Sequence, residues 1–158
     1  MRIFYPDDPL DQRQPEELFR SECELARARG FDVSLFSLED FQRGHFHCKP
    51  QPQAGEAALY RGWMLKLPEY ERLTLALQSL GVRPIVSVES YRAAHHLPCW
   101  YPLVKDSTAE TLIYDADTDF ETVLAQVAWP GYFIKDFVKS LNTGPGSLVK
   151  QPGEIAGV

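Results

Sequence analysis

Along most of the chain, short β-prone runs alternate with stretches in which apolar residues recur at helical spacing. Residues 2–5 form the first such run, which predicts a strand. From Pro15 the apolar positions follow a helical period that ends at Gly30, with Glu22 as the polar exception on the stripe. A second strand is expected around residues 33–35. This order of strand, helix and strand is typical of a parallel crossover unit.

The rest of the chain continues this alternation, apart from residues 40–57, where prolines and glycines interrupt any periodicity. Further strands are expected at 58–65, 84–88, 111–114 and 132–138, and further helices at 68–80, 89–96 and 120–127. Strands that alternate with helices in this way predict an α/β fold, in which helices flank a mostly parallel sheet. The last strand and the loop after it are expected to begin a second lobe.

Length, charge and cysteine content narrow the class of protein. The 158 residues favour one domain, or one domain and a fragment, and can bury a core without a disulfide or a structural metal. The net charge of −6 argues against a nonspecific nucleic-acid or membrane-surface binder. The sequence has neither a signal-peptide h-region nor an apolar run of about 18 residues, and its three cysteines follow no paired spacing. The expectation is a cytoplasmic protein with free thiols.

Lysine and aromatic side chains share one face of the last predicted strand. Because successive strand residues point to opposite faces, every second residue from 133 to 139 lies on the same side. The residues on that side are Phe133, Lys135, Phe137 and Lys139. The loop that follows contains Gly144, Gly146 and Ser147, whose backbone N–H groups can approach an anion closely. Phosphate suits this combination, although an edge strand that lysines protect from aggregation accounts for it equally well.

Three segments, in the same order along the chain, resemble the ATP-grasp superfamily. Residues 134–140, Ile-Lys-Asp-Phe-Val-Lys-Ser, resemble its nucleotide-binding strand, most closely that of the clade named for one arginine and two lysines. Residues 60–64, Tyr-Arg-Gly-Trp-Met, resemble the arginine motif of that clade. The stretch from Tyr91 and His95 to Tyr101-Pro102 resembles the segment between the two motifs.

The resemblance implies a domain layout and a set of nucleotide-binding residues. Residues 1–128 would form a pre-ATP-grasp-like α/β domain, and residues 129–158 would begin an incomplete nucleotide-binding ATP-grasp lobe. Arg61 would face the nucleotide cleft as a catalytic residue that holds a carboxylate or a phosphate bidentately. Two lysines would hold the nucleotide phosphates, a glycine-rich loop would close over them, and an earlier lysine would add a contact. These cofactor-binding residues are Lys135, Lys139, Gly144, Gly146, Ser147 and Lys105.

The activity that the resemblance implies is the ATP-dependent joining of a carboxylate to an amine or a similar nucleophile. ATP phosphorylates the carboxylate, the nucleophile attacks the acyl phosphate, and ADP and phosphate are released; lysine, arginine and Mg²⁺ stabilise the transferring phosphoryl group. The magnesium ligands of complete enzymes belong to a later lobe, and Glu154 is the lone carboxylate after Asp136. The chain is therefore expected to be the front portion of such a ligase, without turnover on its own.

An alternative from another class is a stand-alone interaction module that keeps this fold but performs no chemistry. Such a module would assemble with itself or with a protein partner through apolar surface. Neither nucleic acid nor a membrane is expected as a partner under either hypothesis.

Two groups of histidine and cysteine residues give a competing signal for zinc. They are His45, His47 and Cys48, and His95, His96 and Cys99. His45 and His47 would share a face on a strand, which is half of a tetrahedral site. Neither group has the spacing of a zinc module, so core or surface histidines are the preferred interpretation and no metal site is assigned.

Overall fold

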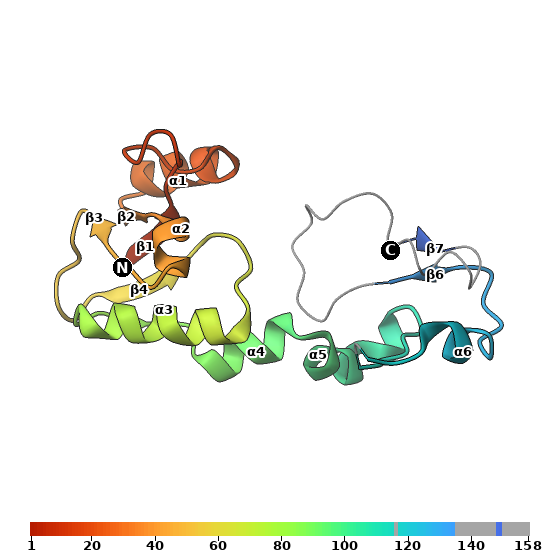
Figure 1. Cartoon of the computed structure of the whole chain (residues 1–158). Helices are drawn as coiled ribbons and strands as arrows, with labels where there is room; N and C mark the ends of the chain where they lie inside the picture. The colour runs from red at the N-terminus through yellow and green to blue at the C-terminus, as the bar shows by residue number, and fades with distance from the viewer. Residues whose placement is uncertain (116, 135–147, 150–158) are drawn as a thin grey trace. The chain divides into compact units, whose positions relative to one another are not determined.

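The computed structural model of the protein describes residues 1–115, 117–134 and 148–149. The chain divides into two compact units, Met1–Arg92 and Ala93–Val158, whose elements are drawn in Figure 1. The domain boundary expected near residue 128 lies within the second unit and stays a prediction.

The first unit is built on a five-stranded sheet with the strand order β3-β2-β1-β4-β5. The strands are β1 (Arg2–Pro6), β2 (Asp32–Phe36), β3 (Cys48–Lys49), β4 (Ala57–Tyr60) and β5 (Arg83–Pro84). Neighbouring strands are parallel except β2 and β3, which pair antiparallel at one edge. The expected α/β fold is thus confirmed, as a mixed sheet flanked by helices.

Helices lie on both faces of this sheet, with α1 and α3 on opposite sides (Figure 1). They are η1 (Glu17–Phe19), α1 (Arg20–Ala28), α2 (Leu38–Gln42), α3 (Leu67–Ser79) and α4 (Val88–His95). Tyr5 of β1 belongs to the same buried cluster as Cys23 of α1. Its neighbour Phe4 belongs to a second cluster, with Leu73 of α3. Because adjacent strand residues point to opposite faces, β1 is buried on both sides and holds the two cores together.

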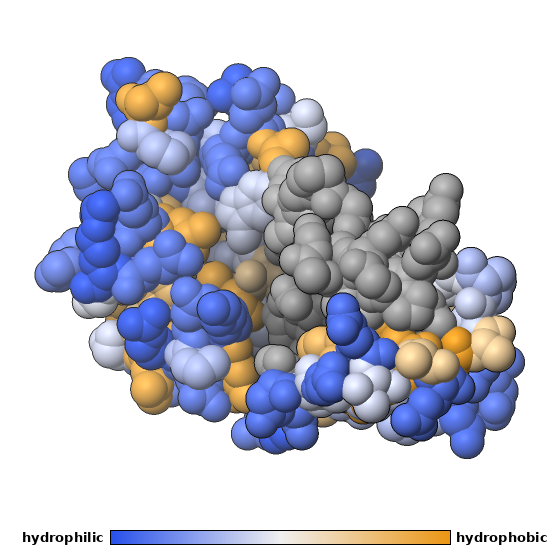
Figure 2. Space-filling view, turned by 45° about the vertical axis from the view of Figure 1, so that its right-hand side comes forward, coloured by the Kyte–Doolittle hydropathy of each residue, from blue (hydrophilic) through white to orange (hydrophobic). Residues whose placement is uncertain are grey.

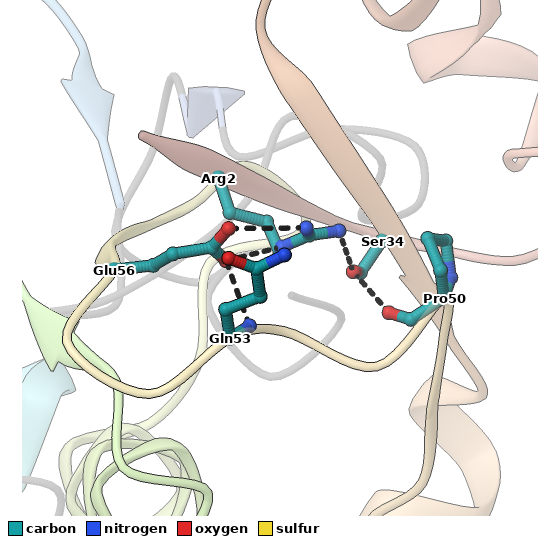
Figure 3. Close-up of polar contacts among 5 residues, drawn as sticks. All are labelled: Arg2, Ser34, Pro50, Gln53 and Glu56. Carbon is teal, nitrogen blue, oxygen red and sulfur yellow. Dashed lines mark hydrogen bonds and ion pairs between the residues drawn. The ribbon is translucent and has the colours of Figure 1, made fainter.

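A buried arginine fixes the amino-terminal edge of the sheet (Figure 3). The guanidinium of Arg2 donates to the carboxylate of Glu56 through Nε at 2.6 Å and Nη2 at 3.3 Å, and to Ser34 Oγ through Nη1 at 3.1 Å. Ser34 Oγ in turn donates to the carbonyl of Pro50 at 2.6 Å, and Glu56 accepts from the amide of Gln53 at 3.2 Å. These charge-assisted hydrogen bonds tie the loop between β3 and β4 to the two central strands.

The second unit contains short elements. They are α5 (Leu97–Val104), η2 (Lys105–Ser107), α6 (Phe120–Leu124), and the antiparallel pair β6 (Tyr132–Phe133) and β7 (Leu148–Val149). Leu124 of α6 is buried, and the partly buried residues packed against it are Val123, Val127, Trp129 and Ile134. The strand β6 coincides with the start of the strand expected at 132–138, whose residues from 135 onward lie outside the described residues.

The structure corrects two local predictions and adds one helix. Residues 111–114 form no strand, and the amide of Thr111 donates to the phenol of Tyr101 at 3.0 Å instead of to a neighbouring strand. The helix expected at 89–96 is confirmed as α4, and a separate helix that was not expected, α5, begins at Leu97. A proline in the first helical turn removes an N–H group that would have no partner in the helix, so the helix can start through it. The segment that carries His45 and His47 is a loop before β3, not a strand.

Two expectations from composition can be compared with the structure. No helix in the described parts of the chain is long and apolar enough to cross a membrane. Cys23 and Cys48 are buried free thiols, and Cys99 is free and half-buried. Burial raises the pKa of the Cys23 and Cys48 thiols, which makes both poor nucleophiles.

Candidate functional site

The carboxyl ends of β1 and β4 lie side by side at the centre of the sheet. From β1 the chain passes through α1 to β2 on one side, and from β4 it passes through α3 to β5 on the other (Figure 1). Such a reversal is a topological switch point, where open α/β sheets bind ligands outside the strand ends. Arg61 directly follows β4, and its amide donates to the carbonyl of Phe4 in β1 at 2.9 Å. The arginine expected from the sequence to be functional is therefore at the switch point.

The side chain of Arg61 forms a bidentate ion pair with Glu22 of α1. Its Nε lies 2.7 Å from Oε1 of Glu22, and its Nη2 lies 2.8 Å from Oε2. The phenol of Tyr5 donates to the same Oε1 at 3.1 Å. The hydrogen bonds from Arg61 lower the pKa of the Glu22 carboxyl, and the pKa of Arg61 is raised in turn. Burial and the bond to Glu22 raise the pKa of Tyr5, so its proton stays in place.

This ion pair is open to solvent on one side. The side chain of Arg61 is 51% exposed and that of Glu22 is 41% exposed. A guanidinium presents its N–H groups as a planar fork that matches carboxylate and phosphate oxygens. Glu22 occupies the fork of Arg61 in the structure. Because water reaches both groups, the pair contributes little free energy, and a ligand anion could displace Glu22 or bind beside it at small cost.

A closed turn places Arg61 beyond the end of β4. The phenol of Tyr60 donates to the carbonyl of Trp63 at 2.7 Å, so its ring crosses over the residues between them. A Cβ atom on Gly62 would lie 2.5 Å from the Tyr60 phenol oxygen and 2.7 Å from ring carbons. Only glycine fits beneath the ring, which gives the Tyr-Arg-Gly-Trp sequence a steric reason.

The indole of Trp63 anchors the far end of this turn to the segment before α1. Its Nε1 donates to Glu16 at 2.6 Å, and its ring meets Phe19 edge-on with centroids 5.6 Å apart. Phe19 also contacts the ring of Tyr5, at a centroid distance of 6.5 Å. Aromatic contacts and a hydrogen bond therefore link the turn that carries Arg61 to Glu16, Phe19 and Tyr5.

The other predicted site residues do not lie in the first unit with Arg61. Lys105 is the first residue of η2 in the second unit and is exposed. The residues that lie outside the described part of the chain are Lys135, Lys139, Gly144, Gly146 and Ser147. Their roles stay predictions, as does a shared cleft with Arg61.

Among the described residues, no three His, Cys, Asp or Glu side chains come close enough together to hold a metal ion. The two histidine and cysteine groups therefore form no such site there. Magnesium, which the resemblance implies, also lacks a set of ligands within the described residues.

Sequence reasoning missed the residues that position Arg61. Glu22 pairs with Arg61 directly, Tyr5 bonds to Glu22, and Trp63 anchors the turn that carries Arg61. The three residues come from different segments. One signal was available, because Glu22 is the polar residue on an otherwise apolar helical stripe. A charged residue at such a position needs a partner, and that partner is Arg61.

No protein-family model matches the sequence, and no curated protein or solved structure matches it either. The α/β fold and the surroundings of Arg61 are therefore the structural features that bear on the function of the chain. The likeness to ATP-grasp proteins stays a prediction that rests on residues 60–64, 91–102 and 134–140.

Proposed function

We propose that this chain supplies the α/β domain and the first phosphate-binding elements of an ATP-dependent carboxylate–amine ligase of the ATP-grasp kind. The observation that carries the proposal is the position of Arg61, which lies at the switch point with its guanidinium fork half-exposed. In open α/β sheets this is the place where ligands bind. The lysines and glycines of the sequence motif add residues suited to phosphate.

In this proposal Arg61 binds the carboxylate substrate or the oxygens of the phosphoryl group that it receives. Its pairing with Glu22 through two N–H donors has the geometry that a substrate carboxylate would need. Fixed cationic donors aimed at developing negative charge lower the barrier to phosphoryl and acyl transfer. Lys135 and Lys139 would hold the nucleotide phosphates, and Lys105 would add a contact.

ATP and Mg²⁺ are the cofactors of the proposed reaction. Bound magnesium would neutralise charge on the nucleotide phosphates. Because the described residues provide no set of metal ligands, no step of the reaction is derived through the metal.

The arginine assignment can be tested through the Nε–H signal of Arg61 in a proton–nitrogen NMR spectrum. Titration with sodium acetate, and separately with inorganic phosphate, should shift this signal in a saturable way. Glu22→Gln weakens the competing pair and should tighten anion binding by about fivefold. Arg13 is a matched control, because it makes a similar bidentate pair with Asp11 on an exposed loop. An Arg61 signal that responds to salt no more than the Arg13 signal would contradict the assignment.

Nucleotide binding is tested by isothermal titration of the chain with ATP and Mg²⁺. The variant Lys135→Ala/Lys139→Ala should weaken binding by more than about tenfold, since each lysine contributes a charge-assisted bond to phosphate. Lys49→Ala/Lys66→Ala removes two exposed lysines of the first unit and should leave binding unchanged. Equal binding by both double variants would overturn the lysine assignment. Absence of binding by the wild type would overturn the nucleotide proposal itself.

The alternative is an interaction module without chemistry. It requires a contiguous apolar surface. Exposed large apolar residues do occur, including Leu10, Leu18, Leu75 and Leu103, but they belong to separate elements. Figure 2 shows that hydrophilic residues predominate on the face in view, with apolar residues in separate groups. Sedimentation analysis tests this alternative, which predicts concentration-dependent self-association.

A further inference from the structure

A pocket of about 280 Å³ opens at the carboxyl edge of the sheet, beside the ends of β1 and β2. Asp7, the residue after β1, and Ser37, the residue after β2, contribute to its wall. Its other acidic lining residues are Glu16, Glu39 and Asp40. The lining contains no lysine, arginine or histidine from the described parts of the chain, so the pocket favours cations.

Asp7 is the buried member of this acidic set. It is only 9% exposed, and its amide donates to the carbonyl of Phe36 at 2.9 Å. Among the described residues, no other residue donates a hydrogen bond to its carboxylate. Burial, with the nearby charges of Asp40 and Asp8, raises the pKa of Asp7 to about 6. A largely buried carboxylate to which no other described residue donates a hydrogen bond is costly to keep charged, and a bound cation would reduce that cost.

The two arginines nearby are paired with carboxylates other than that of Asp7. Arg43 lies 2.6 Å from Glu39 and 3.6 Å from Asp40, and all three side chains are largely exposed. Arg13 pairs with Asp11. These arginines offset part of the negative charge at the rim and leave the carboxylate of Asp7 without a counter-ion.

The lining and the volume of the pocket favour an organic cation over a metal ion. No three acidic, histidine or cysteine side chains of the described residues converge closely enough to ligate a metal. The volume is just below the usual range for ligand pockets, which suits a small molecule, and exceeds what one ion needs. A primary ammonium group carries one positive charge and three N–H donors, which suits several carboxylates placed around it.

We infer that this pocket binds the primary ammonium group of a small organic amine, with the carboxylate of Asp7 accepting one of its N–H bonds. The inference deepens the proposed function and rests on it in one respect, since the amine, once its ammonium group has lost a proton to water, would be the nucleophile of the ligase. Glu16 connects the two sites, because it lines the pocket and also accepts the indole N–H of Trp63. Trp63 ends the turn that carries Arg61.

Titration with ethylamine hydrochloride at pH 7 and constant ionic strength, followed by proton–nitrogen NMR, tests this inference. The amide signals of Asp7, Ser37 and Asp40 should shift in a saturable way. Asp7→Asn keeps the shape of the side chain and should weaken binding by at least about tenfold. Glu17→Gln makes the same change of charge at an exposed residue near the pocket and should have no effect.

Three outcomes would overturn the inference. Equal affinity of the wild type and Asp7→Asn for ethylamine would show that the Asp7 carboxylate does not contribute to binding. Shifts that sodium chloride reproduces would reduce the effect to ionic strength. Tighter binding of magnesium chloride than of ethylamine at the same signals would identify a metal site instead. Thermal unfolding of each variant verifies that the variants are folded.

The pH dependence of ethylamine binding gives a further test. Protonation of Asp7 removes its charge, so affinity for ethylamine should fall as the pH drops through about 6. The other charged groups that face Asp7 or line the pocket are Asp8, Glu16, Glu39 and Asp40, with Arg43 at the rim. Affinity that stays constant from pH 7 to pH 5 would count against Asp7.

The inference and the proposed function can fail separately. ATP binding without ethylamine binding would retain the nucleotide proposal and overturn the ammonium pocket. Ethylamine binding without ATP binding would do the reverse, and it would describe an amine-binding domain.

Discussion

The phenol of Tyr91 bonds to both backbone groups of Leu65. It donates to the Leu65 carbonyl at 2.9 Å and accepts from the Leu65 amide at 2.8 Å, and both bonds are buried. Tyr91 lies on α4, whereas Leu65 lies in the loop that begins at Arg61 and precedes α3. One side chain therefore satisfies two buried polar groups and holds the loop that carries the candidate arginine.

Tyr91→Phe should lower the free energy of unfolding by about 1–3 kcal/mol, because it leaves a buried N–H and a buried carbonyl without their partner. Urea denaturation measures this loss. Tyr70→Phe is the control, since Tyr70 stacks on Tyr91 at a centroid distance of 3.7 Å but makes one partly buried bond, to the Val86 carbonyl. The loss for Tyr70→Phe should be smaller. Equal losses would show that the two buried bonds to Leu65 contribute no more stability than the single bond of Tyr70 to Val86.

Gly62→Ala should destabilise the fold by about 1–3 kcal/mol, because the added Cβ overlaps the ring of Tyr60. The test is a double-mutant cycle with Tyr60→Ala, which removes the ring. In the Tyr60→Ala background the same change at Gly62 should cost much less. An identical cost in both backgrounds would place the strain elsewhere than at the ring.

The sequence allowed the framework of the first unit to be predicted because its signals are local. Apolar alternation and terminating glycines identify β1, α1, β2 and α3, and their order implies parallel strands. The strand expected at 58–65 is shorter in the structure, since β4 ends at Tyr60. The Tyr60 phenol then donates to the Trp63 carbonyl and closes a turn.

The edge strand β3, the partner of Arg61 and the acidic pocket depend on contacts between residues far apart in the sequence. No local sequence pattern predicts them. The edge strand β3 has only two residues, and it lies in a segment where prolines and glycines hide any period. At the candidate site, Arg61 was identified from its motif. Its partner Glu22 lies 39 positions away in the sequence, and only the fold brings the two together. The acidic pocket around Asp7 combines residues that follow two different strands, so no single stretch of sequence displays it.

Arg2→Met should cost about 2–4 kcal/mol of stability, because it leaves the carboxylate of Glu56 without its partner and removes the bond to Ser34. The pair is largely buried, with 7% of the Arg2 side chain and 17% of the Glu56 side chain exposed. Arg13→Met breaks an exposed pair of the same type and should leave stability unchanged within error. Chemical denaturation compares the two variants.

The same pair offers a second comparison. In the double variant Arg2→Met/Glu56→Gln no unpaired charge remains, so part of the stability should return. A double variant as unstable as the sum of the two single variants would mean that Arg2 and Glu56 act independently.

Asp7→Asn should stabilise the protein at neutral pH. The pKa of Asp7 is raised to about 6 in the folded protein from an ordinary value of 3.8, mainly by burial. Between these two values the folded state binds a proton that the unfolded state has released, so the free energy of unfolding falls as the pH rises. Asparagine carries no charge and escapes this penalty. The stability difference between Asp7→Asn and the wild type should therefore grow from pH 4 to pH 7, by up to about 3 kcal/mol.

Urea denaturation of both proteins at several pH values measures this difference, and the effects of titrating groups that do not interact with Asp7 cancel in it. Glu17→Gln, at an exposed position, should differ from the wild type by the same amount throughout. A difference for Asp7→Asn that is equally flat would mean that the Asp7 carboxylate is solvated in the folded protein. It would then have no need of a cation, and the case for an ammonium ligand in the pocket would lose its physical basis.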